Sequence, residues 1–131
     1  GKAKVLQEGI DVTLFGWGAM IPICMEASQK AKEKGWSLEV VDLRTIVPLD
    51  LEAVLHSAKK TGRVVVVQEA VKTAGFGSEI SAFIGENAME YMKAPIVRVA
   101  GFDIPFPYTL EHVYMPDAMR VLTAINKVMQ Y

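Results

Sequence analysis

Residues 42–50 constrain the fold of this chain more than any other segment. A predicted strand, Ser37 to Leu43, leads into the segment, and a predicted amphipathic helix begins directly after it, at Leu51. Pro48 fixes its own φ and has no amide hydrogen to donate, so regular structure breaks between the two elements. Asp50 stands where a helix N-cap residue is expected, because its carboxylate can accept a hydrogen bond from the first turn. The segment is therefore a strand-to-helix connection, the repeating unit of an α/β domain.

Strands and helices alternate along the rest of the chain, about five of each to a fair approximation. Strands are predicted at Asp11–Trp17, Ser37–Leu43, Arg63–Gln68 and Ile96–Ala100, and helices at about Ala19–Lys34, Leu51–Lys59, Gly75–Asn87 and Pro116–Met129. Parallel strands need crossover connections, which are usually helices. The pattern predicts a three-layer α/β fold, with a mostly parallel five-stranded sheet covered by helices on both faces.

Two segments sharpen this prediction. The run Val64 to Val67 is continuously apolar, which is typical of a central strand buried on both faces. In the last helix, Pro116 is expected at the first position, where a missing amide hydrogen costs nothing. An apolar stripe should pack that helix on the sheet, and it consists of Met119, Leu122, Ile125 and Met129.

Length and composition exclude several classes of protein. A chain of 131 residues is one ordinary domain, expected to span residues 1–131, and it has no apolar run of the roughly 20 residues that cross a bilayer. The net charge is −1 and the basic residues are scattered, which argues against a nucleic-acid surface. The single cysteine, Cys24, is interpreted as a small buried hydrophobe. The first residues lack the features of a signal or transit peptide, so we expect a domain excised from a longer chain.

Few residues have a pattern typical of catalysis. Gly75-Phe76-Gly77 lacks the remaining residues of a dinucleotide or P-loop motif, so backbone geometry is favoured there over anion binding. His56 and His112 are isolated, and no metal site is predicted. No nucleophile motif occurs. We predict no catalytic, cofactor-binding or metal-binding residue in this chain.

Three charged residues are candidates at the carboxyl edge of the sheet, where open α/β sheets bind ligands. Arg44 follows the second predicted strand, Glu69 follows the Val run, and Asp103 follows the fourth. Glu69 can cap the Gly75 helix, pair with Lys72 or Arg44, or contact a ligand, and the structural roles are favoured. Asp103 can join these residues or cap the loop that follows it.

The segment from Gly101 to Met115 is predicted to be an ordered, aromatic, proline-rich loop. It contains Phe102, Phe106, Tyr108 and Tyr114, together with Glu111. Such clusters mark either an interface or a small satellite core, and the two interpretations are weighed equally. Phe106, Tyr108 and Glu111 are the interface candidates.

Several short blocks resemble one enzyme family in the same order along the chain. They include Gln7-Glu8-Gly9, Trp17-Gly18, residues 42–50, Lys60 to Arg63, Ala94-Pro95 and Pro105-Phe106-Pro107. The chain resembles the C-terminal, transketolase-like domain of the beta subunit of thiamine-dependent 2-oxo-acid dehydrogenases. The branched-chain member is favoured over the pyruvate dehydrogenase beta subunit, and a transketolase-type enzyme of other specificity, which shares the fold, is a further alternative.

The resemblance implies a parent enzyme that decarboxylates branched 2-oxo acids and transfers the acyl group to lipoyl-lysine. It implies thiamine diphosphate and magnesium bound outside this chain, and partners that are the alpha subunit, a second beta subunit in an α2β2 tetramer, and the subunit-binding domain of the dihydrolipoyl acyltransferase. The compartment would be the mitochondrial matrix in a eukaryote and the cytoplasm in a bacterium. The fragment itself should be inactive and serve assembly.

Two residues are implicated in docking. Tyr131 offers a ring and, if it is the natural end of the chain, a carboxylate. Lys93 stands where family members often carry an acidic docking residue, so a basic partner would be repelled there. A different class of function stays open, in which the domain is a sensor of small anions near Arg44, Glu69 and Gly75.

Overall fold

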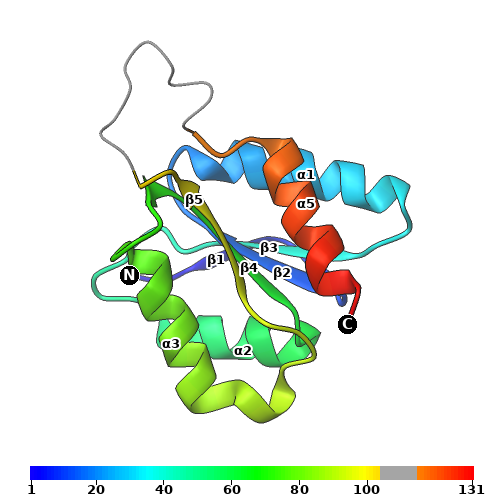
Figure 1. Cartoon of the computed structure of the whole chain (residues 1–131). Coiled ribbons are helices and arrows are strands. Elements are labelled where there is room, and N and C mark those ends of the chain that lie inside the picture. Colours follow the sequence, from blue (N-terminus) through cyan, green and yellow to red (C-terminus); the bar gives the residue numbers. More distant parts are fainter. Residues whose placement is uncertain (104–114) are drawn as a thin grey trace.

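The computed structural model describes residues 1–103 and 115–131 and contains a five-stranded sheet between two layers of helices (Figure 1). The candidates Phe106, Tyr108 and Glu111, with His112 and Tyr114, lie outside the described residues. In chain order the elements are β1 (Lys4–Gln7), β2 (Val12–Gly16), α1 (Met20–Glu33), β3 (Leu38–Asp42), α2 (Leu51–Thr61), β4 (Val64–Val71), α3 (Phe76–Ala88), the 3-10 turn η1 (Met89–Tyr91), β5 (Val97–Gly101) and α5 (Ala118–Met129).

The sheet order is β1-β3-β2-β4-β5, and every neighbouring pair is parallel except β1 with β3. Helices α1 and α5 cover one face, and α2 and α3 cover the other (Figure 1). This confirms the predicted three-layer, mostly parallel architecture. Within the described residues, four α-helices and η1 make up the helical segments.

The centre of the sheet is closed to solvent. Every residue of β2 is buried, and Val64 to Val67 of β4 are 0% exposed. Alternate side chains of these strands enter two separate apolar cores, one beneath α1 and α5 and one beneath α2 and α3. The continuous valine run therefore has the central position expected of it.

The edge strand β1 was not located from the sequence. Three of its four residues are exposed, and its pairing with β3 is interrupted by an irregularity between Val5 and Gln7. The strand is held partly by a side chain, since Gln7 Nε2 donates to Ser28 Oγ at 2.5 Å and to the carbonyl of Leu38 at 2.7 Å. A short exposed edge strand has no apolar periodicity to detect.

The connection at residues 42–50 has the predicted form. Asp50 is the N-cap of α2, and its Oδ1 accepts a hydrogen bond from the Ala53 amide at 3.1 Å. The Val47–Pro48 peptide bond is cis. At the other end of α2, Gly62 has φ of 70°, the left-handed C-cap expected there.

Two details of the last helix were predicted wrongly. The helix begins at Ala118 rather than at Pro116, because the Asp117 carboxylate caps it by accepting from the Arg120 amide at 2.8 Å. Met119 is 58% exposed and does not belong to the packing stripe, whereas Leu122 and Ile125 are buried.

Candidate functional site

The carboxyl ends of β3, β4 and β5 meet at one edge of the sheet (Figure 1), and the three charged candidates lie along it. Arg44 and Glu69 are exposed, and so is Asp103. The backbone of Arg44 has φ of 62°, and its amide donates to Asp42 Oδ1 at 2.9 Å. Neither Arg44 nor Glu69 forms an ion pair with any residue that the structure describes.

Asp103 is held by the β4–α3 loop, chiefly by Thr73. Its carboxylate accepts from the Thr73 amide at 2.9 Å and from the Thr73 hydroxyl. These hydrogen bonds lower the pKa of Asp103. The carboxylate therefore ties the end of β5 to the neighbouring loop instead of joining Arg44 and Glu69.

The glycines at the start of α3 serve backbone packing. The buried side chain of Gln68 accepts from the Gly77 amide through Oε1 at 2.6 Å and donates to the Val71 carbonyl through Nε2 at 3.0 Å. A Cβ at Gly75 would lie 2.1 Å from Gln68 Nε2. The helix N-terminus is thus partly satisfied by the protein itself, which weakens the case for an anion there.

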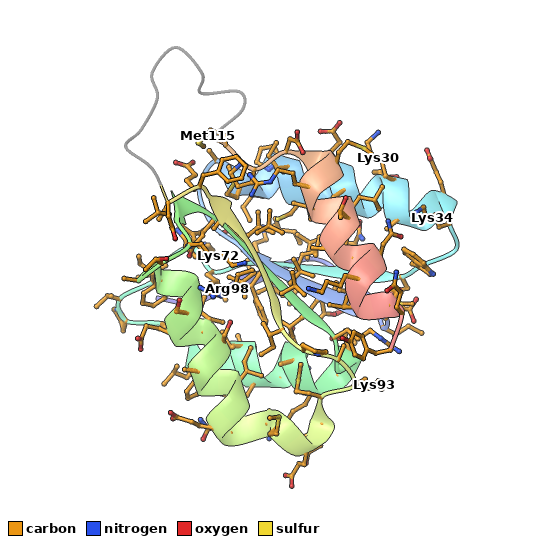
Figure 2. The ribbon with its side chains drawn as sticks, in the orientation of Figure 1. Lys30, Lys34, Lys72, Lys93, Arg98 and Met115 are labelled. Atoms are coloured by element: carbon orange, nitrogen blue, oxygen red, sulfur yellow. The ribbon has the colours of Figure 1, made fainter. Side chains whose placement is uncertain are left out.

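Arg98 on β5 makes a second link at this edge that sequence reasoning missed. Its Nη1 donates to Ser78 Oγ at 2.7 Å and to the Lys72 carbonyl at 3.0 Å. Figure 2 shows Arg98 and Lys72 near each other at the α3 side of the sheet. The partners lie 20 and 26 residues away in the sequence, so no local pattern signals the contact.

The two docking candidates lie at the opposite, amino edge of the sheet and flank the same turn. The Lys93 amide donates to the Gly62 carbonyl at 2.8 Å. The next residue, Arg63, donates from Nη2 to the Tyr131 main-chain oxygen at 3.0 Å and from Nε to the Val128 carbonyl at 3.1 Å. Lys93 is exposed, Tyr131 is 61% exposed, and Figure 2 shows Lys93 on the side of the molecule where the chain ends.

Arg63 therefore closes the C-terminal end of α5. Its cationic side chain satisfies carbonyl groups that a helix leaves without partners, and its charge complements the negative end of the helix dipole. Arg63 contacts Tyr131, and the exposed Lys93 is bonded to Gly62, the residue before Arg63, so this surface has a positive character. The main-chain oxygen of Tyr131 already has a partner within the chain, and the ring is the more accessible part.

At the same amino edge of the sheet, the buried carboxylate of Glu39 connects two of the blocks that resemble the enzyme family, Gln7-Glu8-Gly9 and Lys60 to Arg63. Glu39 is 1% exposed, and it accepts from Lys60 Nζ at 2.6 Å, Ser57 Oγ at 2.5 Å and the Gly9 amide at 3.3 Å. Burial acts to raise the pKa of Glu39, but the hydrogen bonds from Lys60, Ser57 and Gly9 outweigh it, and the pKa is lowered. The hydrogen bond to Glu39 also raises the pKa of Lys60. This network is structural, since it joins β3 to α2 and to the turn before β2.

Cys24 is fully buried, as expected. Burial raises the pKa of its thiol to about 12, and the charge of Asp42 adds to the shift. Within residues 1–103 and 115–131, no three His, Cys, Asp or Glu side chains gather where they could hold a metal ion. No helix in that part of the chain is long and apolar enough to cross a membrane.

Comparison with known proteins decides the family. The model of the transketolase C-terminal domain matches residues 1–121. The chain belongs to this family. It is 48% identical, over its whole length, to the 2-oxoisovalerate dehydrogenase beta subunit of Dictyostelium discoideum, of which it spans 36%. It is 45% identical over 98% of its length to the pyruvate dehydrogenase E1 beta subunit of Leifsonia xyli subsp. xyli, of which it spans 39%.

Solved structures agree with this assignment. A split-gene transketolase, described as an inactive beta4 tetramer, superposes with a TM-score of 0.87 at 31% identity, and the match covers 98% of this chain and 41% of that one. A 2-oxoglutarate:ferredoxin oxidoreductase shares the fold, with a TM-score of 0.66 at 14% identity, over 99% of this chain and 20% of that one. This transketolase C-terminal domain is thus homologous to the beta subunits of 2-oxo-acid dehydrogenases and spans less than half of the relatives named. Branched-chain and pyruvate enzymes match it almost equally well.

Proposed function

We propose that this chain is the assembly and partner-docking domain of the beta subunit of a branched-chain 2-oxo-acid dehydrogenase. The observation that carries the proposal is the 48% identity to a 2-oxoisovalerate dehydrogenase beta subunit over the entire chain. The parent enzyme would decarboxylate branched-chain 2-oxo acids oxidatively and pass the acyl group to lipoyl-lysine. Residues 1–131 would form one domain of a longer subunit.

The domain alone would not catalyse this reaction. We infer from the family resemblance that thiamine diphosphate and magnesium, which the parent enzyme would use, are bound outside this chain. We assign no catalytic step to the domain. The domain would instead contribute contact surfaces for the other subunits of the complex.

One surface suited to assembly lies around the open edge of β1 and the connection that follows β3. Large aliphatic side chains are exposed there: Val5, Leu6, Ile10, Val47 and Leu51. Among the described strands β1 pairs with β3 alone, and its other edge lies among these side chains; such an edge is normally covered. The structurally similar split-gene transketolase is itself described as a tetramer of beta chains. These features support packing against the alpha subunit and a second beta subunit in an α2β2 tetramer.

The second surface is the Tyr131 surface, formed by Tyr131 with Arg63 and Lys93. We assign it to docking the subunit-binding domain of the dihydrolipoyl acyltransferase. Arg63 fixes the end of α5, so the ring of Tyr131 is presented from an ordered helix end. The positive side chains favour carboxylates of the partner and disfavour a partner that is basic at this point.

A pyruvate dehydrogenase beta subunit is the nearest alternative, favoured by the 45% identity to such a subunit. The compartment would follow the source, either the mitochondrial matrix or a bacterial cytoplasm. The two assignments are separated by reconstituting the beta subunit that contains this domain with an alpha subunit and comparing its rates on 2-oxoisovalerate and pyruvate. A rate on pyruvate above that on 2-oxoisovalerate would reject the branched-chain assignment.

The assembly role is tested by sedimentation velocity of the beta subunit containing this domain, mixed with its alpha subunit. Val47→Glu places a charge on a side chain that is 78% exposed, so the fold should be preserved while the tetramer dissociates. Met89→Glu is the matched control, because Met89 is 70% exposed but lies on η1, away from the β1 edge. A Val47→Glu variant that still forms the tetramer would contradict the assigned surface.

The sensor alternative makes a different prediction. Titration of the isotope-labelled chain with inorganic phosphate should shift the amide resonances of Arg44 and Gly75 if the carboxyl edge binds anions. We expect no saturable shift, because the Gly77 amide already has a partner in Gln68.

A further inference from the structure

A polar pocket lies where three segments meet at the amino edge of the sheet. Its volume is about 350 Å³, and it is lined by residues at the end of β1, at the C-terminal end of α1 with the turn that follows, and at the start of β3. This volume is near the lower limit for small-molecule sites, so a ligand of the pocket would be small. None of the candidate sites described above includes this pocket.

Hydrogen bonds within the chain fix the frame of the pocket. Gln7 Nε2 donates to the Leu38 carbonyl at 2.7 Å, and the Ser37 hydroxyl oxygen accepts from the Ile10 amide at 3.1 Å. The Leu38 side chain is buried, so this residue shapes the pocket without offering apolar surface to it. In the turn, Gly35 has φ of 83°, and a Cβ there would meet no atom within 4 Å, so this side of the pocket is open.

Trp36 is the large apolar residue of the pocket. It is half-buried and packs against the core beneath α1 and α5. Lys34 Nζ lies 5.2 Å from the centroid of its ring and donates to Asn126 Oδ1 of α5 at 3.0 Å, which ties the ring to that helix. Figure 2 shows Lys34 at this end of α1. A ring held in place offers a ligand a large apolar contact.

The pocket also has one side chain of each charge, Glu8 and Lys32. Among the described residues, Lys32 forms no ion pair, with Glu8 or with any other carboxylate. Glu8 lies 4.0 Å from Lys60 Nζ, whose nearer partner is Glu39 at 2.6 Å, and the Glu8 side chain is 84% exposed. Both charges are therefore available to a ligand. A ligand with a single charge would be attracted by one of them and repelled by the other, whereas a zwitterion can meet both.

We propose that this pocket binds a small zwitterion, namely an α-amino acid with an apolar side chain. The ammonium group of the ligand pairs with Glu8, its carboxylate pairs with Lys32, and its side chain rests against Trp36. The proposal goes beyond the assembly and docking roles and does not depend on them.

Binding is tested by titrating the ¹⁵N-labelled 131-residue chain with L-norleucine. Hexanoate is the same molecule without the ammonium group, and pentylamine is the same molecule without the carboxylate. We expect saturable shifts of the amides of Glu8 and Gly35 and of the Trp36 indole N–H, whose signal is identified with Trp36→Phe. Hexanoate and pentylamine should each bind at least about fivefold more weakly than norleucine, because each lacks one charge contact and keeps one repulsion.

Variants of the two charged residues locate the site. Glu8→Gln should weaken norleucine binding about three- to fivefold and strengthen hexanoate binding, because a repulsion is removed. Lys32→Gln should weaken norleucine binding to the same extent and strengthen pentylamine binding. A merely structural effect of either substitution would not respond in opposite directions to the two kinds of ligand.

Glu86→Gln on α3 and Lys127→Gln on α5 are the matched controls. Both residues are exposed and lie outside this pocket, so each substitution should change the affinities less than about twofold. Circular dichroism establishes that each variant is folded.

The proposal is overturned by any of four results. They are no saturable binding of norleucine, equal binding of hexanoate or pentylamine, equal effects of the pocket variants and the control variants, or shifts that map away from the pocket. Loss of tetramer assembly would leave this test unaffected, so the two proposals fail separately.

Discussion

Replacing Gly9 by alanine should destabilise the domain severely. Gly9 is buried in the turn before β2, where its amide donates to Glu39. A Cβ at this position would lie 2.2 Å from the carbonyl carbon of Leu38 and 2.5 Å from its oxygen. Ordinary carbon contacts are about 3.5 to 4 Å long, so the new atom overlaps the backbone of β3 by more than an ångström. Such a backbone cannot move aside cheaply.

The magnitude follows from the cost of overpacking. Inserting a methyl group into a packed interior costs about 1 to 3 kcal/mol when side chains can adjust. Here the obstacle is main chain within a strand paired on both sides, so we expect a loss of about 3 kcal/mol or more in the free energy of unfolding for Gly9→Ala. The hydrogen bond to Glu39 would be strained as well.

The same substitution at Gly85 should have the opposite sign. Gly85 lies within α3, and a Cβ added there meets no other atom within 4 Å. Alanine is the better helix former, and Gly85→Ala should therefore stabilise the domain by about 0.5 to 1 kcal/mol.

Urea unfolding at 25 °C, followed by far-ultraviolet circular dichroism, gives both free energies by linear extrapolation. A Gly9→Ala variant within about 0.5 kcal/mol of the unchanged protein would refute the steric reasoning. A Gly85→Ala variant less stable than Gly9→Ala would refute it equally.

Other predictions follow from single contacts. Asp50→Ala removes the carboxylate that accepts from the amides of Ala3 and Ala53, and urea unfolding should show a loss of about 1 kcal/mol. These hydrogen bonds lower the pKa of Asp50 in the folded state. The stabilisation that its carboxylate provides is therefore fully present above about pH 4, the pKa in the unfolded chain, and is lost as the pH falls through the folded pKa. The free energy of unfolding of Asp50→Ala should accordingly fall less steeply with acidification than that of the unchanged protein. The Cys24 thiol, with a pKa of about 12, should react with a disulfide reagent at pH 8 only at the rate of unfolding, and rapid labelling of the folded chain would contradict its burial. Arg63→Met should accelerate amide exchange in the last turn of α5, because two carbonyl oxygens lose their donor, and unchanged exchange would show that Arg63 does not fix that end.

The fold was predictable from the sequence where burial is strong and local. The run Val64 to Val67 indicated a central strand, and Asp50 and Gly62 marked the ends of α2, because caps act within one helical turn. The strand β1 was missed since an exposed edge strand carries no apolar periodicity. Pro116 was misplaced because the competing cap at Asp117 is the stronger start signal.

For the candidate site, the sequence predicted where the charged residues lie in the fold but not which residues they contact. The topology placed Arg44, Glu69 and Asp103 at one edge of the sheet, as the order of strands requires. Their partners were not predictable, because a contact such as Asp103 with Thr73 joins residues 30 positions apart through loops whose geometry has no sequence signature. The link from Arg63 to Tyr131 spans 68 positions and was missed for the same reason.

The most direct test of the docking role is calorimetric titration of the chain with the subunit-binding domain of the acyltransferase. Tyr131→Ala removes the ring but keeps the main-chain oxygen that Arg63 contacts, and Met89→Ala is a control on η1 whose side chain is also exposed, at 70% against 61% for Tyr131. We expect binding that weakens at least about tenfold in Tyr131→Ala, and on deletion of Tyr131, but not in Met89→Ala. Equal affinity of all these proteins, or no binding by the unchanged chain, would contradict a docking surface at Tyr131.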